Sequence, residues 1–340
     1  MFNTALFRCI AGVALAFFTL AAPVARAQTF VFSENISSAA YPNGLLYHPV
    51  DMAVDASGDI FVASTDGNLV TEMDSAGNYI RYLGNSGFGN GQYSLPGGVA
   101  IDTNGNVFLS DGGNGHVEVF SNSGVYLRRM GAQSSSNGGL SFPSGLALDG
   151  LGDVFVADSN NHRIAKFTVG GNFVRNIGSY GSGQGQMIYP HSVAIGLSGS
   201  VFALDTGNHR VEKFTNTGGY IRTFGGLGSG DGQLNNPQGI TSDKSGNIFV
   251  ADTLNNRIVE FSNTGQFLQN IGGAGAGDGH FDNPSGVKFD NLGNMYVADT
   301  LNNRIVEFAL VSVPELGAWT LLASGLVGGL GLMALRRKRG

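Results

Sequence analysis

Short apolar segments alternate with turns rich in glycine and asparagine over most of the chain. In the stretch that begins at Pro96, apolar runs at 99–102, 107–111, 116–120 and 125–130 are separated by the turns TNGN, GGNG and SNSG. Asn and Gly accept positive φ angles at little cost, and the apolar positions do not follow a 3.6-residue period. The pattern predicts a four-stranded antiparallel meander without a helix.

The meander recurs every 47 residues. Segments 250–261 and 297–308 are identical, and both read VADTLNNRIVEF. A proline marks the same position of each unit, at Pro49, Pro96, Pro143, Pro190, Pro237 and Pro284. A second column holds Asp55, Asp102, Asp149, Gly196, Asp243 and Asp290. Six units that keep one frame without an insertion indicate a repeat architecture.

The inner strands of these units are apolar at nearly every position, as in IFVA and MYVA. Sheets packed face to face around a closed ring bury both of their apolar faces. We therefore predict an all-β, six-bladed β-propeller. The sixth unit offers three strands, near 286–290, 295–299 and 304–308, and segment 29–36 lies at the phase of the missing fourth strand. We expect this N-terminal strand to close the ring.

The first 27 residues differ from the repeats. Arg8 precedes an apolar run at 10–20, and Ala25-Arg26-Ala27 forms a small-x-small site before Gln28. This is the pattern of a secretory signal peptide, with a buried first helix as the alternative. The single cysteine, Cys9, lies in this segment, so the mature chain would have neither disulfides nor thiolate chemistry.

The other end carries an uncharged run at 319–335, which is at the short limit for crossing a bilayer. Four basic residues follow directly, from Arg336 to Arg339. Positive charge on one flank favours leaving that end in the cytoplasm, so we expect one transmembrane helix with the repeats outside. Gly325 and Gly329 have the spacing of a helix-pairing motif, although plain small-residue composition explains them as well.

The repeats between these ends are acidic. Residues 28–312 hold 13 basic and 24 acidic side chains, a net charge of −11. A nucleic-acid binder needs a basic face to neutralise phosphates, so the charge balance argues against nucleic acid as a partner.

The consensus P-x-G-V-A-x-D-x-x-G-N-I-F-V-A-D-T-x-N-N-R-I-V-x-F resembles the NHL repeat over about residues 45–310. The tail resembles a PEP-CTERM sorting signal, with Val313-Pro314-Glu315 at its start and Leu316 in place of the usual second proline. The resemblance implies an exosortase-like processing enzyme as a partner, in bacteria that export polysaccharide. The expected organisation is a signal peptide at 1–27, a propeller at 28–312 and a sorting tail at 313–340.

Two polar columns of the repeat vary together. Four units pair an Asp at the end of the second strand with an Arg at the start of the third: Asp158/Arg163, Asp205/Arg210, Asp252/Arg257 and Asp299/Arg304. The first unit has lost both, with Ser64 and Leu69, and the second pairs Asp111 with His116. We interpret the column as structural ion pairs that fasten a loop rather than as catalytic groups. The neighbouring column of Asn161, Asn208, Asn255 and Asn302 suits turn residues that bond their own backbone.

The histidines do not form a metal-binding pattern. His162 and His209 share one phase and His116 lies one position later, on adjacent blades whose loops diverge. We therefore expect neither a metal nor a cofactor.

His191 follows Pro190 near the axis, and its counterparts are Val50, Gly97, Ser144, Gln238 and Ser285. These positions break the repeat consensus and should ring one mouth of the channel. Variable residues on a constant frame are where specificity normally lies. They suggest a ligand site formed by His191, Gln238 and Asp51, with ordinary loop variation as the alternative.

The favoured function is a non-enzymatic binding or scaffold module, at the cell surface or in the extracellular matrix, for protein or exopolysaccharide. The alternative is a lyase or lactonase with a metal in the channel, which would need several His or carboxylate groups to converge there. Some NHL proteins are ubiquitin ligases or RNA binders, but this chain has no zinc-finger cysteines and an acidic balance.

Overall fold

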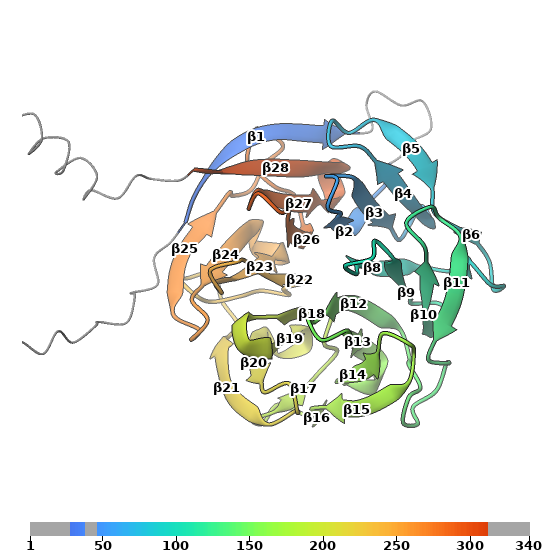
Figure 1. Ribbon diagram of the computed structural model, residues 1–340. Coiled ribbons are helices and arrows are strands. Elements are labelled where there is room, and N and C mark those ends of the chain that lie inside the picture. The colour runs from blue at the N-terminus through green and yellow to red at the C-terminus, as the bar shows by residue number, and fades with distance from the viewer. Residues whose placement is uncertain (1–27, 38–45, 312–340) are drawn as a thin grey trace, which may run out of the picture.

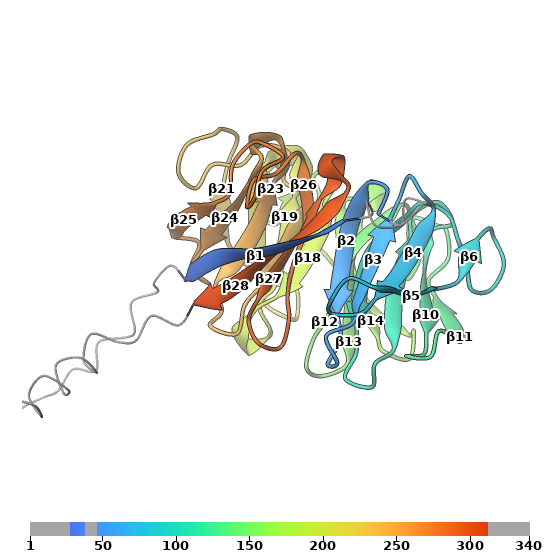
Figure 2. The same ribbon diagram turned by 90° about the horizontal axis from the view of Figure 1, so that it is seen from above.

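The computed structural model describes residues 28–37 and 46–311, which form six four-stranded antiparallel sheets around a central axis (Figure 1). In the view turned by 90°, the sheets stand side by side around the ring (Figure 2). The six-bladed all-β propeller predicted from the repeats is therefore confirmed.

The strands of each blade follow one another outward from the axis. Blade one consists of β2 (Pro49–Val54), β3 (Ile60–Ser64), β4 (Leu69–Met73) and β5 (Tyr79–Tyr82). Blade two consists of β8 (Pro96–Ile101), β9 (Val107–Asp111), β10 (His116–Phe120) and β11 (Tyr126–Met130). Blade three consists of β12 (Pro143–Leu148), β13 (Asp153–Asp158), β14 (Arg163–Thr168) and β15 (Phe173–Ile177).

Blades four to six repeat this order. Blade four consists of β18 (Ser192–Ile195), β19 (Val201–Asp205), β20 (Arg210–Phe214) and β21 (Tyr220–Gly225). Blade five consists of β22 (Gly239–Ser242), β23 (Ile248–Asp252), β24 (Arg257–Phe261) and β25 (Phe267–Ile271). Blade six consists of β26 (Pro284–Phe289), β27 (Met295–Asp299), β28 (Arg304–Val311) and β1 (Thr29–Ser37).

Strand β1 closes the ring as the repeat phase predicts. It pairs antiparallel with β28, the last strand of the described chain, in a register that places Phe32 opposite Phe308 and Ile36 opposite Ile305. Figure 1 shows the blue β1 beside the red β28. The two ends of the chain are thus joined in one sheet.

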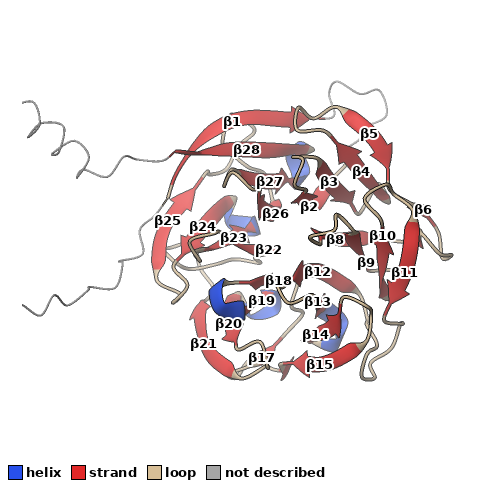
Figure 3. Cartoon of the chain, in the orientation of Figure 1, coloured by secondary structure: helices blue, strands red, loops and turns tan. Residues whose placement is uncertain are grey.

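Short connections carry the remaining regular structure. Two parallel ladders lie in the links between blades: β6 (Asn85–Ser86) with β7 (Gln92–Tyr93), and β16 (Ser179–Tyr180) with β17 (Gln186–Met187). The meander was expected to contain no helix, but the described part of the chain has five three-residue 3-10 turns (Figure 3). They are η2 (Ser159–Asn161), η3 (Leu197–Gly199), η4 (Thr206–Asn208), η5 (Thr253–Asn255) and η6 (Thr300–Asn302). All but η3 lie in the polar loop after the second strand, where turns of this length are common connectors.

The hydrophobic core is divided among the six seams between neighbouring blades. The buried residues form six clusters, and each combines side chains from two adjacent sheets. Phe61 and Phe120, for example, meet in the seam between blades one and two, while Phe108 and Phe167 meet in the next seam. This explains why inner strands such as β3 are buried at every position.

The expected signal peptide and sorting tail, including the proposed span 319–335, lie outside the described residues. Within the part of the chain that is described, no helix has the length and apolar character needed to cross a bilayer.

Candidate ligand site at the mouth of the central channel

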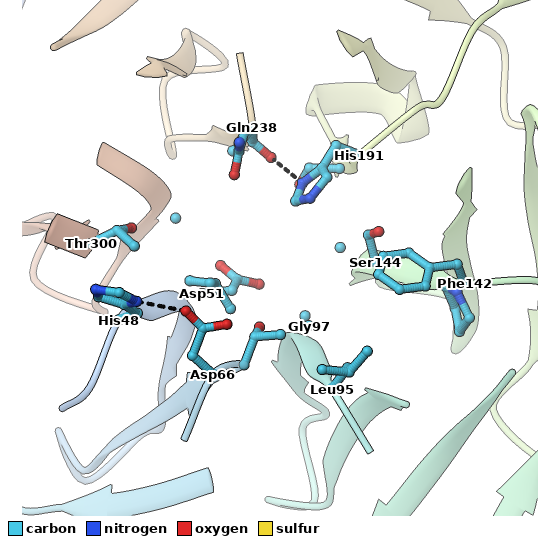
Figure 4. A pocket seen from close by; sticks show the side chains of 18 of the residues that line it. His48, Asp51, Asp66, Leu95, Gly97, Phe142, Ser144, His191, Gln238 and Thr300 are labelled. Carbon is cyan, nitrogen blue, oxygen red and sulfur yellow. Dashed lines mark hydrogen bonds and ion pairs between the residues drawn. The ribbon is translucent and has the colours of Figure 1, made fainter. Parts of the chain in front are cut away.

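A cavity of about 380 Å³ occupies one mouth of the channel, and residues of all six blades line it (Figure 4). Its wall includes five of the six positions that follow the repeat prolines: Val50, Gly97, Ser144, His191 and Gln238. The sixth, Ser285, is buried and donates a hydrogen bond of 2.8 Å to the Val50 carbonyl. The inner strands begin at this mouth, which is why these positions meet there.

The three residues proposed as a ligand site, His191, Gln238 and Asp51, all line this cavity. His191 Nδ1 lies 3.0 Å from the backbone carbonyl oxygen of Gln238. A carbonyl only accepts, so Nδ1 donates and Nε2 of the neutral ring is left as an acceptor. Burial lowers the pKa of His191, and the Gln238 bond and the Asp51 charge offset only part of this effect. The ring is therefore neutral at pH 7.

Asp51 lies deeper in the channel and is paired with a lysine from the opposite mouth. Its Oδ2 lies 3.3 Å from Lys288 Nζ and accepts a hydrogen bond of 3.2 Å from the Val99 amide. Lys288 lines a second cavity, of about 320 Å³, at the other mouth of the channel. Burial raises the pKa of the Asp51 carboxyl, against the opposing effect of Lys288. The ion pair thus joins a residue that lines one cavity to a residue that lines the other.

Both partners of this pair depart from the repeat. The Asp51 column otherwise holds Gly98, Gly145, Ser192, Gly239 and Gly286. These glycines allow the inner strands to approach closely, since a Cβ at Gly239 would lie 2.0 Å from the Ser285 carbonyl oxygen. Lys288 stands where the other units have Ala or Thr, and sequence reasoning overlooked it. The difference between Lys288 and the Ala or Thr of the other units is the feature of the sequence that could have identified it.

The rim of the mouth is built from residues in a left-handed backbone conformation. The residue before each repeat proline has a φ between 47° and 53°, namely His48, Leu95, Phe142, Tyr189, Asn236 and Asn283. Asn tolerates this conformation, whereas it is unusual for Leu, Phe and Tyr. Leu95, Phe142 and Tyr189 are nevertheless 39%, 41% and 55% exposed. Strained positions with exposed apolar side chains tend to mark functional surfaces.

A belt of hydrogen bonds between blades holds this rim. The backbone amides of five of the six rim residues donate to a side chain of the preceding blade, as in Leu95 to Asn68 Oδ1 at 2.7 Å. Tyr189 and Asn236 donate to His162 Nδ1 and His209 Nδ1 at 3.0 and 2.9 Å. These two histidines therefore serve as structural acceptors. Blade two has Gly115 at the acceptor position of this column. Because glycine has no side chain, the Phe142 amide lacks the corresponding acceptor.

The cavity wall has an apolar side and a polar side. Leu95 and Phe142 lie together on one side of the opening, and His48 and Thr300 lie across from them (Figure 4). His48 Nδ1 is 2.6 Å from the Asp66 carboxylate. A ligand held here would thus meet apolar surface on one side and hydrogen-bonding groups on the other.

The repeated dodecamer forms clamps on the links between blades. In all four expected Asp–Arg pairs, the Arg Nε lies 2.7–2.8 Å from an Asp oxygen. Arg257 also donates to the carbonyls of Ser229, Gly230 and Gln233, each at 2.9 Å. Asp252 is fully buried and accepts a 2.6 Å bond from the Asn235 amide. The pair therefore holds the incoming loop through one backbone amide and three backbone carbonyls.

The neighbouring asparagines act differently from the prediction. Asn255 Nδ2 donates to Asp252 at 2.8 Å and to the Gly228 carbonyl of the incoming link at 2.8 Å. The expectation that this column bonds its own backbone was wrong. Asx turns do occur in this chain, but at Asp55 and its column, where Asp55 Oδ1 accepts from the Ser57 amide at 2.8 Å.

Blade two replaces the arginine of the clamp with a buried histidine. His116 Nε2 lies 3.0 Å from both Asp111 and Glu118, and Arg129 donates to Glu118 at 3.0 Å and to the Gly89 carbonyl at 3.1 Å. Burial lowers the pKa of His116, but hydrogen bonds to the two carboxylates outweigh it and raise the pKa to about 9. Asp111, His116 and Glu118 are the one grouping of three potential metal ligands among residues 28–37 and 46–311. They do not line the mouth cavity.

Comparison with known families supports the repeat and the fold. Residues 140–167 match the NHL repeat, and residues 231–318 match a family described as a 6-bladed beta-propeller. No curated protein matches the sequence.

Solved structures of different activities resemble the chain. A virginiamycin B lyase from Staphylococcus aureus has 16% identity and a TM-score of 0.58, covering 83% of this chain and 100% of the lyase. A gluconolactonase from Xanthomonas campestris has 14% identity and a TM-score of 0.61, covering 85% and 99%. An auxiliary nutrient binding protein from Bacteroides ovatus has 12% identity and a TM-score of 0.63, covering 84% and 78%. At these identities the likeness concerns the fold alone.

Proposed function

We propose that the chain is a binding module that holds its ligand at the channel mouth lined by His191, Gln238 and Asp51. The observation that carries the proposal is the convergence of repeat-breaking residues from the blades on one cavity. Ligand sites in proteins are typically concave, largely apolar and equipped with a few placed polar groups. The Leu95 and Phe142 side supplies the apolar surface, while His191 Nε2 supplies an acceptor.

The chemistry of the wall favours a ligand with one apolar face and one row of hydroxyl or amide donors. Sugar rings of an exopolysaccharide and side chains of a surface protein both have this character. The carboxylates of the mouth are both engaged, Asp51 by Lys288 and Asp66 by His48. Hydrogen bonding and apolar contact, rather than net charge, would therefore dominate recognition.

The test is a binding screen of the purified protein against glycans and secreted proteins of its own organism. A His191→Ala/Gln238→Ala variant should bind the ligand so found at least about tenfold more weakly, because it loses two polar contacts. His280→Ala is the control, since His280 is exposed and does not line the cavity. Unchanged affinity of the double variant would refute the proposed site.

The metal-dependent lyase or lactonase alternative finds less support at this mouth. The carboxylates there are engaged by Lys288 and His48, and the one three-ligand grouping of the described chain lies elsewhere. Metal analysis of the purified protein separates the two functions. A stoichiometric metal whose removal abolishes an activity would favour the enzyme.

We further propose that the protein is exported and that the 319–335 segment anchors it with the propeller outside the cytoplasm. The support is the signal-peptide pattern of residues 1–27 and the resemblance of the Val313-Pro314-Glu315 tail to a PEP-CTERM signal. An exosortase-like enzyme would then process the tail, and the propeller would remain at the cell surface or enter the extracellular matrix. Mass analysis of both ends of the protein recovered from its host tests this proposal.

A further inference from the structure

The segment where β1 begins contacts a buried carboxylate that has no cationic partner among the described residues. The Gln28 backbone nitrogen lies 3.3 Å from Glu260 Oε2, and Glu260 is fully buried. The other donors to Glu260 are the neutral amides of Asn247 and Gln269, at 2.7 and 2.6 Å. Burial of a carboxylate is costly unless a positive charge accompanies it.

Blade one shows how a carboxylate at this position of the repeat is neutralised. Glu72 occupies the same column as Glu260 in blade one, and Arg81 lies 2.5 Å from its carboxylate. The Arg81 column continues as Arg128, Arg175 and Arg222, but blade five has Gln269 instead. Gln269 keeps the role of joining the outer strand to the next blade, because its amide donates to the Gln28 carbonyl at 2.6 Å. Blade five therefore keeps the hydrogen bond to the next blade but has no positive charge at this position.

A second carboxylate, that of Asp243, belongs to a residue that lines the same cavity as Gln28. A cavity of about 330 Å³ is lined by Gln28, Asp243, Lys244, Ser245 and Asp290, among others. Asp243 Oδ2 is buried and forms no hydrogen bond with any residue of 28–37 or 46–311. Lys244, the neighbouring cation, donates to the Asn291 carbonyl at 2.6 Å. Burial raises the pKa values of both Glu260 and Asp243, as expected for carboxylates that lack a cation.

We propose that the α-ammonium group created by cleavage between Ala27 and Gln28 is the missing cation of this site, so that processing of the N-terminus locks the ring. An amide has one N–H, whereas an α-ammonium has three donors and a positive charge. It can therefore serve Glu260 and still offer a proton towards Asp243 Oδ2. The proposal shares the expected cleavage site with the export proposal, but it can be tested without export.

The same contact should protect the terminus chemically. An N-terminal glutamine cyclises when its neutral amine attacks the side-chain Cδ, which forms a lactam and expels ammonia. Pairing with Glu260 keeps the amine protonated, and the Gln28 side chain is held at 3.2 Å from Ser245 Oγ. Gln28 of the folded protein should thus resist cyclisation.

Four chains test this inference: one that begins at Gln28, one extended by two alanines before Gln28, and the Glu260→Gln variant of each. The extension should lower the equilibrium constant for folding about tenfold in the native sequence and have little effect in Glu260→Gln. Glu72→Gln is the matched control, because its partner is Arg81 and its cost should not depend on the N-terminus. Equal effects of the extension in both backgrounds would overturn the proposal.

Mass spectrometry supplies a readout that a purely structural role would not change. The chain that begins at Gln28 should keep its full mass during prolonged storage, and Glu260→Gln should lose one ammonia several times faster. Gln28→Ala retains the ammonium but cannot cyclise, so its stability should match that of the uncyclised native chain. Cyclisation at the same rate with and without Glu260 would count against the ion pair.

Discussion

The Asp–Arg clamp shows how one residue can hold a whole loop. Asp252 is fully buried and joins Arg257, Asn255 and the Asn235 amide. Removing one partner of such a pair leaves the other buried and unpaired. We expect Asp252→Ala to lower the free energy of unfolding by about 3–5 kcal/mol, measured by urea denaturation.

The matching double variant tests the reason for this loss. Asp252→Ala/Arg257→Ala removes both charges, so it should be less destabilising than the sum of the two single variants. Additive effects of the two substitutions would show that the side chains do not act as a pair.

His116 makes the stability of blade two depend on pH. Its pKa of about 9 lies above the ordinary value near 6.5, so the folded state holds the proton more tightly. The resulting stabilisation is fully present below about pH 6.5 and is lost as the pH rises through about 9. Relative to His116→Gln, we expect an advantage on the order of 3 kcal/mol near pH 6 that fades by about pH 10.

Chemical denaturation at several pH values measures this difference, and NMR titration of the His116 ring locates its pKa. Parallel pH profiles for the native protein and His116→Gln would contradict the assignment of a charged imidazole.

At the scale of elements, the sequence predicted most of what the structure contains. The 47-residue frame placed the strands, and the phase of residues 29–36 placed β1 beside β28. The polar loops were less predictable. Asn255 bonds a carbonyl 27 residues earlier in the chain rather than its own turn, because the link between blades passes beside it. A local pattern cannot show a contact that depends on how the links are routed.

At the scale of the whole molecule, the sequence predicted some residues of the channel mouth and missed others. Repeat phase brings His191 and Gln238 to one cavity, because equivalent positions of a ring share one height along its axis, and Asp51 lies one position further along its strand. Lys288 escaped notice because it lies on β26 in blade six, far from Asp51 in the sequence, and the two residues become neighbours only when the ring closes. The left-handed rim was also missed, because the residues before the prolines are of different types and Leu95, Phe142 and Tyr189 do not favour a positive φ.

Ring closure determines how the molecule should unfold. The seam between blades six and one contains Ile36, Met52 and Tyr296, so β1 completes both a sheet and a core cluster. Deleting residues 28–37 would expose the edge of β28 and part of this seam, and exposed edges promote association. We expect the deletion variant to unfold with a shallower, less cooperative denaturant transition and to form dimers or aggregates.

Two substitutions in the intact strand serve as comparators for that deletion. Ile36→Ala should lower stability by about 2–5 kcal/mol while keeping the slope of the transition, because a cavity weakens the ring without opening it. Val31, on the same strand, is 52% exposed, so Val31→Ala should have little effect. Size-exclusion chromatography and urea denaturation distinguish the three variants. A deletion variant that stays monomeric and unfolds with the native slope would mean that the ring does not depend on its closing strand.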